Sequence, residues 1–355
     1  MSKELWKGNE AIAEAAIRAG CRCYFGYPIT PQSEIPEYMS LHMPKAGGVF
    51  LQSESEVAAI NMVYGATGAG ARVMTSSSSP GVSLKQEGIS YMCGAELPGV
   101  IVNVMRGGPG LGTIQPAQGD YFQATRGGGH GDYRLIVFAP ANIQEVVDLM
   151  QEAFDLADKY RMPVMMLLDG MIGQMMEPVE WKRPAIAPED LPEKPWATTG
   201  TKNKRLPNII NSLFIDPDAC NQHNIRLEEK YARVTESEQR YETNDTEDAE
   251  VIFVAFGTPA RLARAAVRLL AEDGIKAGVF RPITVWPYPY DALYKIAAQD
   301  SVKAVVTVEM NTGQMIDDVR IAVKGARPVS FVGSAGGIIP TPYEVAEAAK
   351  KALGR

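Results

Sequence analysis

The stretch Gly26-Tyr27-Pro28-Ile29-Thr30-Pro31 gives the first clear structural signal in this chain. It follows an apolar segment, and its prolines restrict the backbone because the residue before each proline is biased toward an extended conformation. Thr30 is therefore expected on a rigid turn at the carboxyl end of a strand, where open parallel sheets bind ligands. A purely structural turn, with Thr30 capping the next helix, explains the same residues equally well.

A second signal is Ser55-Glu56-Val57-Ala58-Ala59, which opens a predicted helix rich in alanine and glycine. Glu56 is a carboxylate near the start of this helix, and the small residues that follow it would admit a flat ring. The alternative is that Glu56 only complements the helix dipole. The local pattern alone slightly favours this alternative, because acidic first turns are common.

Two loops add candidate polar groups after predicted strands. The segment 75–81 contains five consecutive hydroxyl residues, the last of them Ser79, followed by Pro80 and a glycine. Such a loop can bind ring nitrogens, a carboxylate or a phosphate. The segment 106–112 begins with Arg106, whose planar fork binds two carboxylate oxygens, and continues with glycines. An ordinary turn and a surface loop are equally compatible with these two patterns.

Composition excludes several classes of function. The 35 basic residues are outnumbered by 42 acidic ones, which argues against nucleic acid as the main partner. No apolar run reaches the roughly 18 residues of a membrane span, and the N-terminus does not resemble a secretory signal, so the cytoplasm is the expected location. The four cysteines lack the spacing of an iron–sulfur site and are expected to be reduced. His130 lies in a glycine-rich segment, for which a structural turn is favoured over a position facing a site.

The alternation of helical and strand patterns over residues 8–170 predicts an α/β fold. Its strands are continuous apolar runs, which is typical of a parallel sheet covered by helices on both faces. We expect a helix from Pro31 to His42, with the proline in its first position, and a short buried strand at residues 49–51.

A proline-rich and then charge-rich segment separates this region from a second α/β pattern that begins at Ala249. A structureless loop of this length would be unusual inside a compact domain, so the segment is interpreted as a connector. The predicted organisation is therefore a first domain at residues 1–177, a connector at 178–248 and a second domain at 249–355.

The order of these motifs resembles the α subunit of 2-oxoacid:ferredoxin oxidoreductases, over essentially the whole chain. The branched-chain type, which acts on 2-oxoisovalerate, is the most similar, and the 2-oxoglutarate type follows. The resemblance implies a pyrimidine-side thiamine diphosphate-binding domain with a doubly wound parallel sheet, and a smaller domain similar to the transketolase C-terminal domain. The motifs that carry it are Gly8–Ala11, Tyr27–Pro31, Ser55–Ala59, Ser79–Gly81, Arg106–Pro109 and Val308–Gln314.

The resemblance also implies roles for individual residues. Glu56 would contact N1′ of the cofactor's aminopyrimidine, Thr30 would lie near the substrate and coenzyme A, and Arg106 is a candidate for the substrate carboxylate. The family's serine loop usually reads Thr-Ser-Gly-Pro-Gly, whereas position 79 is a serine here. The cofactor-binding residues implied are Glu56, Tyr27, Pro28, Ile29, Ser79 and Pro80.

The chain lacks the Gly-Asp-Gly motif and downstream asparagine with which thiamine enzymes hold Mg²⁺ and the diphosphate; Leu168-Asp169-Gly170 is the nearest candidate. No metal site is therefore expected on this chain. The resemblance implies a β subunit that carries the Mg²⁺–diphosphate site and a [4Fe-4S] cluster. It further implies a γ subunit, a ferredoxin-like δ subunit and ferredoxin as the electron acceptor.

The implied activity is the coenzyme A-dependent oxidative decarboxylation of a 2-oxoacid to acyl-CoA and CO2. Two alternatives stay open at this point. One is the β-type subunit of a lipoyl-linked 2-oxoacid dehydrogenase, a class with the same pair of domains and the same glutamate. The other is a non-catalytic scaffold that binds a nucleotide or acyl-CoA, because a fold does not by itself define a function.

Overall fold

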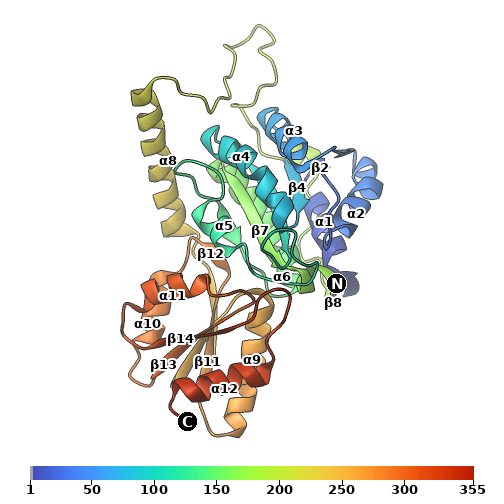
Figure 1. Ribbon diagram of the computed structural model, residues 1–355. Coiled ribbons are helices and arrows are strands. Elements are labelled where there is room, and N and C mark those ends of the chain that lie inside the picture. The colour runs from blue at the N-terminus through green and yellow to red at the C-terminus, as the bar shows by residue number, and fades with distance from the viewer. Residues whose placement is uncertain (1–2) are drawn as a thin grey trace.

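Two α/β units lie one above the other in the computed structural model, which describes residues 3–355 (Figure 1). The first unit is built on a seven-stranded sheet in the order β12-β6-β7-β5-β4-β2-β3, which is parallel except for β12 at one edge. Every residue of β4, β5, β6 and β7 is buried. Ser76 and Ser77, which we expected in a polar loop, belong to β4. The strand bounds are β2 Cys23–Gly26, β3 Val49–Gln52, β4 Val73–Ser77, β5 Gly99–Met105, β6 Ile136–Phe138, β7 Pro163–Asp169 and β12 Thr284–Trp286.

Helices cover both faces of this sheet. On one face α1 packs against α2 and α6, and on the other face α3 packs against α4, so each face has its own apolar core. The predicted α/β class with a parallel sheet is confirmed. The helix bounds are α1 Gly8–Arg18, α2 Glu34–His42, α3 Glu56–Gly68, α4 Ser79–Gly94, α5 Tyr121–Arg126, α6 Ile143–Tyr160 and α7 Gly170–Gln174, with a 3-10 turn at Pro44–Ala46.

The second unit has a five-stranded sheet in the order β14-β13-β10-β11-β9, in which only β9 is antiparallel to its neighbour. Four helices accompany this sheet, and α9 packs against α12. The element bounds are β9 Tyr241–Asn244, β10 Val251–Val254, α9 Gly257–Glu272, β11 Ala277–Pro282, α10 Tyr290–Ala297, β13 Ala304–Glu309, α11 Met315–Val323, β14 Val329–Gly333 and α12 Pro342–Ala352.

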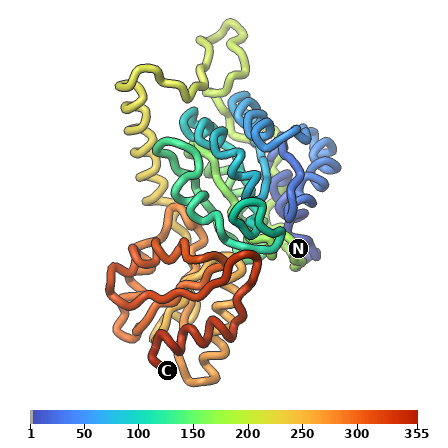
Figure 2. Tube along the Cα trace, viewed as in Figure 1, coloured from blue at the N-terminus to red at the C-terminus, as the bar shows by residue number. Residues whose placement is uncertain are grey.

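The connector runs along the outside of the first unit and then returns toward the second (Figure 2). It begins after β8 (Met176–Val179), which pairs with β1 (Glu4–Lys7), and it contains a 3-10 turn at Pro188–Asp190. Its main element is α8 (Pro217–Ser237), whose buried side chains join a core of the first unit. The connector supplies the edge strand β9 to the second sheet, and β12, which follows β11 of the second sheet in the chain, pairs with the first sheet.

Two local predictions were wrong. The helix expected from Pro31 begins at Glu34, because residues 29–32 form a turn and the Pro31 carbonyl accepts hydrogen bonds from the Asn9 and Gln174 side chains. Residues 49–51 form a strand but are not fully buried, because β3 is the edge strand and Val49 is half exposed.

The carboxyl ends of the first sheet face the second unit. The Gln118 side chain donates to the Phe256 carbonyl at 2.9 Å and accepts from the Met310 amide at 3.1 Å. Asp169, at the end of β7, accepts hydrogen bonds from the amide and the hydroxyl of Thr258 at 2.9 and 2.7 Å. The edge at which parallel sheets bind ligands is therefore the edge that borders the second unit.

Candidate active site

Glu56 lies at the start of α3, and its position depends on Gly81 at the start of α4. The Ser55 side chain caps α3 by accepting a hydrogen bond from the Ala58 amide at 3.2 Å. Only 6% of Glu56 is exposed, yet within residues 3–355 no group donates a hydrogen bond to its carboxylate. A β-carbon at Gly81 would stand 2.6 Å from Glu56 Oε1, so glycine is required for the carboxylate to lie against α4.

Two buried hydroxyl groups just before α4 have no hydrogen-bond partner among residues 3–355, and one of them, that of Ser77, lies near this carboxylate. Ser77 and Ser78, at the end of β4, are fully buried, and neither hydroxyl has a hydrogen-bond partner within the described chain. Ser77 Oγ and Glu56 Oε1 both contact the space that a side chain at Gly81 would fill. Buried polar groups are normally paired, so this group has the character of a site for a polar ligand. The donor and acceptor set fits the edge of a heterocycle such as the aminopyrimidine of thiamine diphosphate.

A buried cation lies deeper in the same region. Lys85 on α4 is fully buried, and its Nζ donates to Thr75 Oγ1 at 2.7 Å and to the Ser76 carbonyl at 3.0 Å. Burial lowers the pKa of Lys85 to about 7, and the negative charge of Glu56 opposes this shift. A lysine with this pKa changes its charge near neutral pH, which makes it unusual among lysines.

Thr30, Ser79 and Arg106, which belong to three separate predicted motifs, meet at the same edge. Arg106 donates from its guanidinium to the carbonyls of Thr30 at 3.0 Å and Leu111 at 3.1 Å. The Ser79 hydroxyl accepts from the Arg106 amide at 3.1 Å. Ser79, which differs from the usual family loop, therefore links the first residue of α4 to the residue after β5 by a hydrogen bond. The buried Nε of Arg106 has no partner within residues 3–355.

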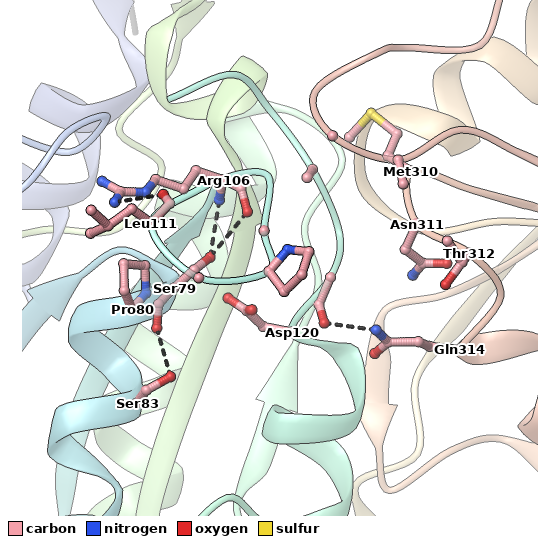
Figure 3. A pocket seen from close by; sticks show the side chains of 17 residues that line it. Ser79, Pro80, Ser83, Arg106, Leu111, Asp120, Met310, Asn311, Thr312 and Gln314 are labelled. Atoms are coloured by element: carbon pink, nitrogen blue, oxygen red, sulfur yellow. Dashed lines mark hydrogen bonds between the residues drawn. The ribbon is translucent and has the colours of Figure 1, made fainter. Parts of the chain in front are cut away.

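A cavity of about 740 Å³ lies between the two units, beside Ser79 and Arg106. Figure 3 shows residues of the first unit on one side and the segment 310–314 on the other. Asp120 also lines it, and Asn103 donates to its carboxylate at 2.9 Å. Burial raises the pKa of Asp120. The cavity thus offers a cation, hydroxyl groups and a carboxyl group around a largely apolar space.

The other predicted site residues are more dispersed. Pro80 lines the cavity, whereas Tyr27 and Pro28 are exposed on the turn and Ile29 is half-buried. His130 is exposed and lines a different cavity, between α4 and residues 212–227. Across residues 3–355, no three metal-ligating side chains are grouped so that they could hold an ion.

The sequence did not predict that Lys85 and Asp120 belong to this site. It also did not predict that Ser77 and Gly81 lie next to Glu56. Lys85 is a single cation in a helix, and nothing in the local pattern shows that it faces the sheet. Asp120 follows a glycine in a long loop and has no motif around it. The hydroxyl run at 75–79 was noted, and it was the one signal that could have pointed to Ser77.

Comparison with known protein families decides the relationship. The family model "Pyruvate flavodoxin/ferredoxin oxidoreductase, thiamine diP-bdg" matches residues 14–250, and "Pyruvate:ferredoxin oxidoreductase core domain II" matches residues 249–345. The chain belongs to the 2-oxoacid:ferredoxin oxidoreductase family. The resemblance inferred from the motifs is confirmed, and these oxidoreductases are enzymes.

Individual members of this oxidoreductase family support the assignment of the chain to it. The chain is 49% identical to the ketoisovalerate oxidoreductase subunit VorB of Methanothermobacter thermautotrophicus, covering 100% of this chain and 99% of that protein. It is 40% identical to the 2-oxoglutarate synthase subunit KorA of the same organism, covering 96% of each. A 2-oxoglutarate:ferredoxin oxidoreductase from Magnetococcus marinus, solved with 2-oxoglutarate, coenzyme A and succinyl-CoA, has a TM-score of 0.85 and 26% identity. The match covers 99% of this chain and 65% of that longer one.

A more distant solved structure shows the fold alone. The inactive β4 tetramer of a split-gene transketolase is 17% identical with a TM-score of 0.61, covering 98% of both chains. The predicted combination of a thiamine diphosphate-binding fold with a transketolase-like second unit is therefore confirmed.

Proposed function

We propose that this chain is the α subunit of a complex that oxidatively decarboxylates a branched-chain 2-oxoacid, with 2-oxoisovalerate as the preferred substrate. The products are the acyl-CoA and CO2, and the electrons pass to ferredoxin. The support for the substrate class is that the ketoisovalerate oxidoreductase subunits are 49% and 51% identical, against 40% or less for the 2-oxoglutarate subunits. These names favour the ferredoxin-linked reaction over the lipoyl-linked dehydrogenase and the scaffold.

The single structural observation that carries the proposal is Glu56, a buried carboxylate without a donor beside the unpaired hydroxyl of Ser77. Thiamine diphosphate, when bound, supplies the electron sink that lets a 2-oxoacid lose CO2. The role of Glu56 is to hold a proton between its carboxylate and N1′ of the aminopyrimidine. Ser77 and Ser78 offer hydroxyl groups to the same ring, and the helix starts of α3 and α4 exclude water behind it.

The substrates are assigned to the edge that holds Arg106 and Thr30. The Arg106 guanidinium orients the carboxylate of the 2-oxoacid, and the fork geometry of arginine suits this task. Thr30 directs its hydroxyl toward the 2-oxoacid or the thiol end of coenzyme A, because its carbonyl is already bonded to Arg106. Tyr27, Pro28, Ile29 and Pro80 complete the wall of the site in this proposal.

A partner subunit is proposed to close the site. Val57 beside Glu56, Leu84 beside Lys85 and Leu51 on the edge strand are each more than 40% exposed. Exposed apolar side chains around a buried carboxylate are typical of a surface that is covered in an assembly. We assign this surface to a β subunit with the Mg²⁺–diphosphate site and a [4Fe-4S] cluster. The proposal also includes γ and δ subunits and a cytoplasmic location. Among the described residues, no helix is long and apolar enough to cross a membrane.

The test is activity of the assembled complex on a panel of 2-oxoacids. The chain is co-expressed with its partner subunits, and 2-oxoacid- and coenzyme A-dependent reduction of ferredoxin is measured. We expect the highest kcat/KM with 2-oxoisovalerate, lower values with 2-oxoglutarate, and turnover about 10² to 10⁴-fold lower in the Glu56→Gln complex. A complex that contains no iron, or that turns over at full rate without Glu56, would contradict the proposal.

A further inference from the structure

Lys85 is a fully buried cation on α4 that the proposed function leaves without a role. It lies four residues after Gly81 on α4, so both residues are on the same face of the helix, one turn apart. The Glu56 carboxylate borders the space that a β-carbon at Gly81 would fill, 2.6 Å from Oε1, and Lys85 lies one helical turn further along α4.

A buried ammonium needs a compensating charge, and Glu56 is the group that provides it. Burying an unpaired charge is costly. The two hydrogen bonds of Lys85 go to neutral acceptors on β4, Thr75 and Ser76. Glu56 on α3 is the charged group that acts on Lys85. The other titratable groups nearby are Tyr24 on β2, which reaches this network through Ser76 at 2.7 Å, and Asp120 beyond β5, which is held by Asn103.

The coupling between the two charges acts without direct contact. No ion pair joins Lys85 and Glu56 in the described chain, because Thr75 and Ser76 hold the ammonium on the strand side. An ammonium in contact with the carboxylate would compete with the aminopyrimidine for it. An ammonium that is held on β4, without touching the Glu56 carboxylate, stabilises the negative charge of that carboxylate and leaves both of its oxygens free.

We propose that Lys85 is a positioning residue whose ammonium is the counter-charge of the Glu56 carboxylate. This inference rests on the proposed role of Glu56. Because Lys85 carries its charge mainly below neutral pH, its influence on Glu56 is strongest in acid and fades in alkali. The charge, rather than the hydrogen bonds of Lys85, is what matters to the site.

Two substitutions separate charge from hydrogen bonding in the assembled complex. Lys85→Met removes both the charge and the donors to Thr75 and Ser76, whereas Lys85→Gln removes the charge and keeps a donor. The readouts are calorimetric affinity for thiamine diphosphate and infrared spectra of the carboxyl region, each measured from pH 5 to pH 9. The protonated-carboxyl band of Glu56 is identified as the band that Glu56→Gln abolishes.

We expect the Glu56 band to appear at a higher pH in both variants than in the unmodified complex, because each variant lacks the positive charge that favours the carboxylate. Cofactor affinity should fall about tenfold below pH 7 and match that of the unmodified complex above pH 8. Lys85→Arg should restore the unmodified behaviour in acid. A loss that is equal at every pH, or present in Lys85→Met and absent in Lys85→Gln, would overturn the proposal. Full turnover by Glu56→Gln would instead overturn the proposed function.

Discussion

Glu56 in the first unit and Glu309 in the second are both buried glutamates, but their surroundings differ. Glu309, at the end of β13, accepts four hydrogen bonds: one from the Asn311 side chain and three from the backbone amides that open α11. Glu56 accepts none from the described residues. A buried carboxylate that the protein satisfies by itself is a structural cap, whereas one that it leaves open is held ready for a ligand.

Two threonines show the same contrast. Thr258 in the second unit donates its hydroxyl to Asp169 at 2.7 Å and so fastens the two units together. Thr30 in the first unit contributes only its backbone carbonyl, which Arg106 uses. Its hydroxyl is exposed on the turn. In each of these two comparisons, the polar group of the second unit is used to hold the structure, while its counterpart in the first unit has no hydrogen-bond partner within the described residues.

The largest expected effect is that of Glu56→Gln on catalysis. The substitution keeps the shape of the side chain and removes the proton that it would share with the cofactor. Turnover of the assembled complex should fall by about 10² to 10⁴-fold. Above pH 8, where Lys85 is mostly uncharged and needs no counter-charge, the melting temperature should stay unchanged because no hydrogen bond is lost. Steady-state kinetics and thermal unfolding of the same preparation check both parts. A Glu56→Gln complex with a lowered melting temperature and unchanged turnover would show that Glu56, like Glu309, has a structural role.

The next largest effect is expected for Gly81→Ala. The added methyl group would overlap with Ser77 Oγ and Glu56 Oε1, so the carboxylate must move. Displacing a catalytic group by about 1 Å costs up to about 100-fold in turnover. Gly65→Ala on α3 is the matched control, because nothing lies within 4 Å of the added carbon. That control should keep full turnover, and similar kinetics for the two alanine variants would refute the proposed packing.

The fold could be predicted from the sequence because its signals are local. The buried strands β5, β6 and β7 consist mostly of apolar residues, and their alternation with helical segments indicated a parallel sheet. The start of α2 was misplaced because the Pro31 carbonyl is bonded by side chains from α1 and α7, which are distant in sequence. The exposure of β3 depends on strand order, which no local pattern contains.

The site could be predicted only in part, for the same reason. The turn at Thr30, the loop at Arg106 and Glu56 each carry a motif, and a family resemblance linked them. Lys85 and Asp120 carry none, because their importance depends on burial and on neighbours from other strands. Sequence spacing cannot show that Gly81 opens the space in which the Glu56 carboxylate lies.

Stability should respond more strongly at Glu309 than at Glu56. Glu309→Ala leaves three buried backbone amides without an acceptor, which should cost about 2 to 4 kcal/mol. The melting temperature of the complex should therefore fall by about 5 °C or more. Glu56→Ala is the matched variant, and above pH 8, where Lys85 is mostly uncharged, it should shift the melting temperature far less because it breaks no hydrogen bond. Equal shifts in the two alanine variants would mean that Glu56 is also a structural cap.

The smallest effects are expected for Thr30→Ala and Thr258→Ala. Comparing these two variants tests the contrast between the two threonines. Thr30→Ala keeps the backbone carbonyl that Arg106 uses, so the melting temperature should be unchanged. If Thr30 contacts a substrate as proposed, the loss of its hydroxyl should raise KM for coenzyme A or the 2-oxoacid by up to about tenfold. Thr258→Ala should instead lower the melting temperature, because burial raises the pKa of Asp169 and that carboxyl group loses a donor that opposes the shift. A Thr30→Ala complex that is less stable but has unchanged KM values would show that the Thr30 hydroxyl is structural. The substrates would then contact this edge of the first sheet through Arg106 and not through Thr30.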